Sequence, residues 1–184
     1  MPDNPIKRDK LDSVLKTLAD LTRKQVLVGV PDSSPEREDG PISNAAIGYI
    51  NEFGAPAANI PARPHLVPGV ESVNDKTSNE LKAAATAALA NKPAVVETSL
   101  NRAGMIAQAA VRREITSGNF APLSDSTLRA RARRGREGAA IELATRKEVG
   151  EDDDRSLEEM NTNARPLIDT GQYRRSITYV VRKK

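Results

Sequence analysis

The residues best placed for hydrolytic chemistry lie near the C-terminus, in the run Leu167-Ile168-Asp169-Thr170-Gly171. An aspartate held in such a turn can meet a second aspartate, often across a dimer. The two carboxyl groups then share one proton and activate a water molecule. The run is therefore a candidate for acid–base catalysis. That chemistry also requires a scaffold of suitable residues around the motif.

The run resembles the active-site signature of aspartic proteases, which needs a flap and supporting strands after the motif. Only 13 residues follow Gly171, too few to build that scaffold from strands that rise about 3.3 Å per residue. We therefore favour a turn, in which Asp169 accepts hydrogen bonds from following amides, Thr170 does so more weakly and Gly171 supplies an unusual φ. We expect this turn to start a short helical segment and to lie at an interface.

Other catalytic and metal-binding arrangements find little support in the sequence. His65 is the only histidine, which excludes a multi-histidine metal site within one protomer, and we expect its ring to pack beside Leu66. The chain has no cysteine, so disulfides and thiolate sites are excluded. The acidic run Glu151–Asp154 lacks the glycine and the distant glutamate of a calcium loop and is typical of a solvated charge run. We expect no cofactor, no metal and no enzymatic activity.

A block of arginines offers two interpretations. The block is followed by an acidic stretch from Glu148 to Glu159, which Arg155 interrupts. Arginines can bind DNA phosphates, which would make the chain a DNA-binding or DNA-packaging accessory protein, but aromatic residues for base stacking are missing. The acidic stretch favours contacts between neighbouring subunits instead. The residues for either contact are Arg129, Arg131, Arg133, Arg134, Arg136, Asp152, Asp153 and Asp154.

A proline-rich segment, residues 54–66, predicts a rigid arm. Prolines at 56, 61 and 64 fix φ, remove amide donors and push the preceding residue into an extended conformation. Phe53, Arg63 and Leu66 at the ends of the arm suit a grip on another chain. The alternative is that Phe53 fills the core and Arg63 forms a surface ion pair, worth about 0–1 kcal/mol.

Three segments carry a family resemblance: Ala46 to Leu66, Phe120-Ala121-Pro122-Leu123-Ser124-Asp125-Ser126-Thr127, and Pro166-Leu167-Ile168-Asp169-Thr170-Gly171-Gln172-Tyr173-Arg174-Arg175-Ser176-Ile177. Together they resemble the tail-completion and neck proteins of long-tailed bacteriophages, with similarity to the virion morphogenesis proteins of transposable phages. The resemblance covers roughly a third of the chain, in dispersed patches. It implies a structural virion protein that forms a ring, expected to be a hexamer, at the head–tail junction or the upper end of the tail.

The resemblance also implies partners and a location. The partners are further copies of the chain and other neck, connector or tail proteins, with DNA passing nearby but not bound by sequence, and no membrane. Assembly would take place in the bacterial cytoplasm and the protein would end in the neck or upper tail of the virion. The residues expected at its interfaces are Phe53, Gly54, Pro61, Arg63, Pro64, His65, Leu66, Leu167, Asp169, Thr170 and Gly171.

Bulk properties fit one domain over residues 1–184. Apolar residues make up 38% and aromatic residues 3%, so the core must consist of Ala, Val, Leu and Ile. Charged residues make up 29% with a net charge of +3, which does not demand a polyanion partner. The N-terminus lacks the apolar stretch of a signal peptide, and no apolar run approaches the roughly 20 residues that span a bilayer.

The periodicity of apolar residues predicts the framework. Helices are expected over 11–21, over 44–53 between a Ser43 cap and a Gly54 stop, over 69–89, and from an Asn91 cap to Gly118. Strands are expected over 25–30 and 176–182, paired antiparallel.

The remaining segments are a mobile loop over 31–42 and a charged insertion over 119–165. The insertion is expected to be helical near 126–134 and otherwise to order on assembly, so that deleting Asn119 to Glu159 leaves a folded protomer. The predicted fold class is α+β, a small antiparallel sheet packed against long α-helices, with the proline-rich arm and the charged insertion added.

Overall fold

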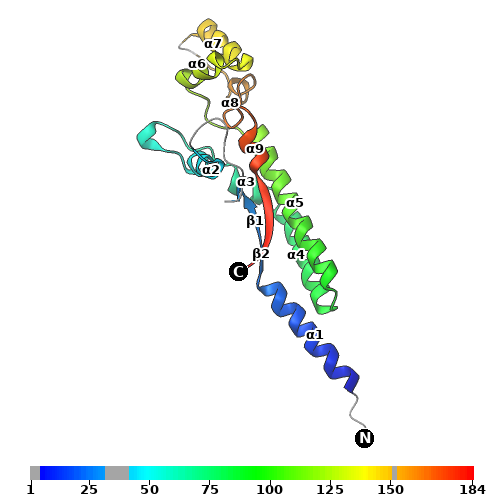
Figure 1. The fold of residues 1–184 in the computed structure, drawn as a ribbon. Helices are drawn as coiled ribbons and strands as arrows, with labels where there is room; N and C mark the ends of the chain where they lie inside the picture. The colour runs from blue at the N-terminus through cyan, green and yellow to red at the C-terminus, as the bar shows by residue number, and fades with distance from the viewer. Residues whose placement is uncertain (1–4, 32–41, 151–152) are drawn as a thin grey trace. The chain divides into compact units, whose positions relative to one another are not determined.

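The computed structural model describes residues 5–31, 42–150 and 153–184. The fold is α+β as predicted, with helices and a two-stranded antiparallel sheet (Figure 1). The described residues form two compact units. Unit 1 takes residues from Met1–Gly29, Gly69–Ala110 and Thr178–Lys184, and unit 2 from Val30–Pro68 and Val111–Ile177. The single domain over 1–184 stays a prediction. The loop over 31–42 falls almost entirely outside the described residues.

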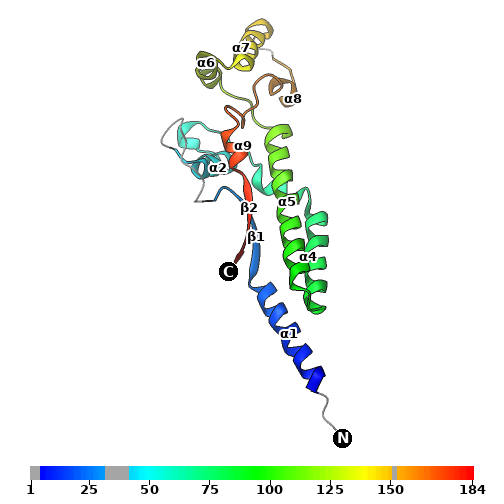
Figure 2. The ribbon, with the colours of Figure 1, turned by 45° about the vertical axis from the view of Figure 1, so that its right-hand side comes forward.

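Unit 1 contains the sheet and the longest helices. Its elements are α1 (Pro5–Thr22), β1 (Lys24–Gly29), α4 (Asn74–Leu89), the first part of α5 (Pro93–Ser117) and β2 (Thr178–Lys183), with the end of α3 (Leu66–Glu71). Figures 1 and 2 show α4 and α5 side by side, with the two strands along them. The strands pair antiparallel with Val26 opposite Val181 and Val28 opposite Tyr179, so the predicted pairing is confirmed.

Small side chains make the core of unit 1. The cluster contains Ala84, Ala87, Ala88, Val96 and Leu100, with Leu18, Leu21, Val26 and Val181 packed against it. Gly104 of α5 lets the Tyr179 ring approach, because a Cβ there would lie 2.2 Å from a ring carbon. The apolar stripe expected along α1 is only half-buried, at Val14, Leu18 and Leu21, and Leu11 and Leu15 are exposed.

The helix boundaries mostly follow the prediction. Val96, Leu100, Ala103, Ala107, Ala110, Val111 and Ile115 of α5 are all buried, as their spacing predicts. The helix expected over 69–89 is interrupted between α3 and α4. Asn91 does not cap α5, because its side chain instead hydrogen-bonds Ser13 and Thr17 of α1. No described helix combines the length and the apolar composition that crossing a bilayer requires.

Unit 2 is built from short elements. They are α2 (Asn44–Phe53), the 3₁₀ helix η1 (Pro56–Ala58), α6 (Asp125–Arg133), α7 (Glu137–Val149), α8 (Leu157–Met160) and α9 (Gln172–Ser176), with the start of α3 and the end of α5. Ser43 caps α2 by accepting a hydrogen bond from Ala46 N at 3.1 Å, and Gly54 ends it with φ +77°, both as predicted. The spacing of Ala46, Ile47, Ile50 and Phe53 predicted an apolar buried face for this helix, but its buried residues are Asn44, Gly48 and Glu52.

The charged insertion over 119–165 is ordered where the structure describes it, which corrects the expectation that it orders on assembly. Leu123, Leu128, Ala139 and Ala164 form a small core of their own. Gly138 permits this packing, because a Cβ there would lie 2.0 Å from the backbone oxygen of Asn163. The sequence suggested disorder because four residues make this core, too few to give a periodic signal in a segment rich in charge.

The proline-rich segment is less extended than predicted. It opens with η1, and Ala55 and Ile60 form an isolated antiparallel bridge around Asn59, whose φ is +54°. Leu66 already belongs to α3. The prolines exclude an α-helix over 56–64 but do not hold the chain straight, because Pro at the first position of a 3₁₀ turn is compatible with a fixed φ.

Candidate functional site

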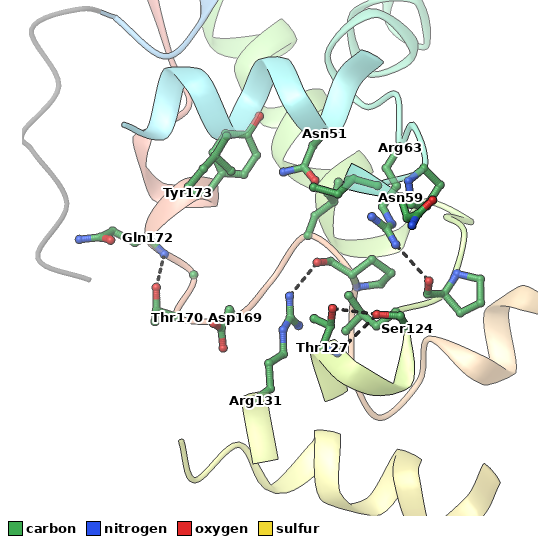
Figure 3. Close-up of a pocket in the computed structure, with 18 residues that line it drawn as sticks. Asn51, Asn59, Arg63, Ser124, Thr127, Arg131, Asp169, Thr170, Gln172 and Tyr173 are labelled. Atoms are coloured by element: carbon green, nitrogen blue, oxygen red, sulfur yellow. Dashed lines mark hydrogen bonds between the residues drawn. The ribbon is translucent and has the colours of Figure 1, made fainter. Parts of the chain in front are cut away.

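Three segments that carry the family resemblance meet around one cavity of unit 2, of about 590 Å³, which we call the motif cavity (Figure 3). Ile47 and Asn51 of α2 line it together with residues from 59–63, 122–131 and 166–173. Its lining is mixed, with Pro61, Pro122 and Pro166 beside hydroxyl, amide and guanidinium groups. Motifs that are more than 100 residues apart in the sequence thus form one site.

Arg63 joins the proline-rich segment to the segment after α5. Its side chain is buried and donates to the carbonyl oxygens of Ala121 at 2.8 Å and Pro122 at 3.0 Å. Burial lowers the pKa of Arg63. The surface ion pair considered from the sequence is wrong. The interface role of Arg63 stays a prediction. Its guanidinium is poorly placed for that role, because it is already hydrogen-bonded inside its own protomer.

Arg131 joins α6 to the C-terminal motif, and it also lines the motif cavity. It donates to the carbonyl oxygens of Arg165 at 2.9 Å, Ile168 at 2.8 Å and Pro166 at 2.9 Å. Burial lowers its pKa as well. Arg131 is therefore a structural residue of the C-terminal motif, separate in role from the exposed arginines around it.

Asp169 binds cations, where the sequence suggested amide donors. Its carboxylate oxygens lie 2.9 Å from Arg134 Nη2 and 3.0 Å from Arg136 Nε. The turn itself is as predicted: Gln172 N donates to Thr170 Oγ1 at 3.3 Å, Gly171 has φ +74°, and α9 then leads into β2. A proton-sharing pair would place a second carboxyl group beside Asp169, and the contacts recorded for it among the described residues are with arginines.

A buried polar network adjoins the motif cavity through Arg63 and Tyr173, which line it. Glu52 accepts hydrogen bonds from the backbone N–H groups of His65 at 2.8 Å, Leu66 at 2.9 Å and Val67 at 3.1 Å, so it holds the first turn of α3. His65 is fully buried and contacts Arg63 O through Nδ1 at 2.8 Å and the Tyr173 hydroxyl through Nε2. The sequence placed His65 beside Leu66 but gave no signal for this network.

The ionisation of this network follows from burial and donors. Burial by itself would raise the pKa of Glu52, but the three backbone N–H groups and His65 outweigh it and lower that pKa. Burial lowers the pKa of His65 and raises the pKa of Tyr173. A neutral His65 that donates from Nδ1 to Arg63 O and accepts from Tyr173 at Nε2 satisfies these contacts.

This state of His65 predicts that acid destabilises the fold. Its pKa is below the unfolded value of 6.5, so the unfolded chain binds the proton first and stability falls as the pH drops below about 6.5. The loss should approach about 1.4 kcal/mol per pH unit at most. Glu52, with a lowered pKa, adds to the loss only below about its unfolded value of 4.5.

Urea unfolding at several pH values between 7 and 5.5 measures this effect. Because His65 is the only histidine, the His65→Gln variant should be less stable at pH 7 and nearly independent of pH in this range. Equal pH slopes for the two proteins would show that His65 is not buried in the neutral form.

A second buried carboxylate, Glu142 of α7, was missed from the sequence. Its side chain is fully buried and is paired with Arg146 at 3.0 Å and Arg155 at 3.1 Å. No pattern in the sequence marks Glu142 as buried, because its burial depends on packing that only the structure shows. Hydrogen bonding to Asp153, and then to Glu142, raises the pKa of Arg155.

The acidic run shows no metal arrangement in its described part. Asp153 lies 2.7 Å from Arg155, which lowers the pKa of Asp153, while Asp152 lies outside the described residues. Among the residues with described positions, no group of three or more carboxylate, histidine or cysteine side chains could hold a metal ion. Asp154 is exposed.

The remaining expected interface residues divide by exposure. Pro64 is exposed, Pro61 and Leu167 line the motif cavity, and Leu66 is half-buried. Gly54 packs tightly, because a Cβ there would lie 2.8 Å from Ala62 N. Phe53 is 65% exposed, so the alternative in which it fills the core is wrong.

The exposed Phe53 ring is paired with Tyr49, one turn earlier on α2. The ring centroids lie 4.8 Å apart and Tyr49 is 66% exposed. Sequence reasoning found Phe53 but missed Tyr49, which its i, i+4 spacing could have indicated.

Comparison of the chain with family models, curated proteins and solved structures finds no match.

Proposed function

We propose that this chain is a non-enzymatic virion assembly protein, a subunit of a ring at the head–tail junction or upper tail of a long-tailed bacteriophage. Its role would be tail completion and head–tail joining. The observation that carries the proposal is the exposed aromatic pair Tyr49 and Phe53. The chain has only five aromatic residues, and two of them are presented to solvent together. Aromatic residues of this kind dominate the energy of subunit interfaces.

The polar residues of unit 2 support a structural role. Arg63, Arg131, Glu52 and His65 direct their side chains to backbone groups or to one another, so they hold the resemblance segments in place. A repeated heterologous contact closes a ring, and in our proposal the α2 aromatic pair of one copy makes that contact with the next.

The alternative, DNA binding by the Arg129–Arg136 block, has less support. Arg131 is buried, Arg134 and Arg136 bind Asp169, and Arg129 lies 3.6 Å from Asp125. The alternative required arginines that are exposed and free of acidic partners, and this block meets that requirement poorly.

Light scattering of the purified protein tests the ring. We expect a mass of about six protomers of 19.9 kDa for the wild type, and of one protomer for the Tyr49→Ser/Phe53→Ser variant. The matched control is Leu89→Ser, which removes a 62% exposed apolar side chain from unit 1 and should keep the ring. A wild type that stays at one or two protomers at every concentration and salt would contradict the proposal. DNA binding by the Arg129–Arg136 block would then be supported if replacing Arg129 and Arg133 lowered the affinity for DNA.

A further inference from the structure

A cluster of cations lies in unit 1 where β1 begins and β2 ends. This basic cluster consists of Lys16, Arg23, Arg182, Lys183 and Lys184. The strand pairing brings the two parts of the chain together, because Lys183 lies opposite Lys24 and Lys184 N donates to Arg23 O at 2.7 Å. Successive side chains of β2 alternate, so Arg182 extends the cluster onto the face of the sheet opposite to Lys183. Figures 1 and 2 both show the C-terminal end beside the junction of α1 and β1.

The charge of the basic cluster is largely uncompensated. Asp20 pairs with Lys183 at 3.1 Å, but it also pairs with Lys24 at 2.8 Å, and Lys24 is shared with Glu97. Lys16, Arg23, Arg182 and Lys184 hold no ion pair with any residue that the structure describes. With Lys24, six side-chain cations face two side-chain carboxylates, an excess of four side-chain charges where the side chains of the whole chain sum to a net charge of +3.

The cluster borders a cavity of about 630 Å³, which Lys16, Arg23 and Lys183 help to line. Its polar wall is fixed by side-chain hydrogen bonds across the unit. Thr17 Oγ1 donates to Asn91 Oδ1 at 3.0 Å, and Asn91 Nδ2 donates to Ser13 Oγ at 2.9 Å. Cations and hydroxyl groups around a hollow are the contacts that proteins make to phosphate oxygens.

We propose that the basic cluster binds the phosphate backbone of double-stranded DNA without regard to base sequence. None of the described residues that line the cavity is aromatic, so stacking on single-stranded bases has no platform there. Uncompensated Lys and Arg charges attract phosphates and release their counterions. An acidic protein surface is the competing partner, and the experiment separates the two. The proposal stands apart from the ring proposal, whose readout is mass.

Fluorescence anisotropy with a labelled mixed-sequence duplex tests the site. Four unpaired cations that each contact a phosphate predict a slope of about −3.6 for log affinity against log salt, or about a hundredfold loss between roughly 50 and 200 mM salt. The Arg23→Gln/Arg182→Gln variant should bind more weakly and lower the steepness of the slope by about 1.8. Both residues are exposed, so circular dichroism should show an unchanged fold.

The matched control is Arg129→Gln/Arg133→Gln, which removes the same charge from exposed positions in unit 2. It should leave affinity and slope close to those of the wild type. If the two double variants have equal effects, the binding depends only on overall charge and the proposed site is overturned. A wild type that does not bind DNA would also overturn it. Binding of poly-glutamate in place of DNA would show that the cluster binds an acidic protein partner.

Discussion

Replacing Arg131 with leucine should lower the free energy of unfolding by about 3–5 kcal/mol. The change removes a charged donor from the carbonyl oxygens of Arg165, Pro166 and Ile168, and leaves these acceptors without it in a buried site. Unfilled buried acceptors cost more than the hydrogen bonds contribute, because they give up water without a substitute. Urea denaturation followed by circular dichroism measures the loss.

The control for Arg131 lies two residues earlier on the same helix. Arg129 has a 62% exposed side chain and contacts Asp125 at 3.6 Å, so Arg129→Leu should change stability by no more than about 0.5 kcal/mol. Similar losses for the two leucine variants would mean that the carbonyl contacts of Arg131 add nothing to the fold.

Replacing Glu52 with alanine should destabilise the protein by about 3–5 kcal/mol. Three backbone N–H groups at the start of α3 would lose their acceptor, and His65 would lose the carboxylate that lies 3.2 Å from its Nδ1. Glu52→Gln keeps one side-chain oxygen, enough for the His65 and Leu66 donors that now share Oε2, and should cost about 1–2 kcal/mol.

The order of the two Glu52 variants in urea denaturation is the informative result. If glutamine costs as much as alanine, the negative charge matters more than the hydrogen-bond geometry. If neither variant loses stability, α3 does not depend on Glu52 for its first turn.

The sequence was a good guide wherever one apolar face decides the structure. The stripe of α5 is visible because burial repeats with the period of the helix, and the two strands are marked by their β-branched residues. The same reasoning gave the wrong face for α2, since its buried side is polar: Glu52 reaches the α3 backbone, and Gly48 leaves room for Tyr173.

Single buried charged residues could not be predicted from the sequence. Nothing in the composition separates Arg131 from Arg129, or Glu142 from its neighbours, because their burial depends on carbonyl groups and cations brought in from distant segments. The deletion of Asn119 to Glu159 is therefore no longer expected to leave a folded protomer. It would remove Arg131 and two leucines of the small unit 2 core, Leu123 and Leu128.

The pairing of β1 with β2 has a consequence for biosynthesis. The two strands are separated by the whole stretch from Val30 to Ile177, so β1 leaves the ribosome roughly 8–30 s before its partner at typical elongation rates of about 5–20 residues per second. During that interval β1 has no strand to pair with, and open strand edges recruit other chains. Unit 1 can complete its sheet only when Thr178–Lys183 has emerged, so the order of translation itself delays the folding of this sheet.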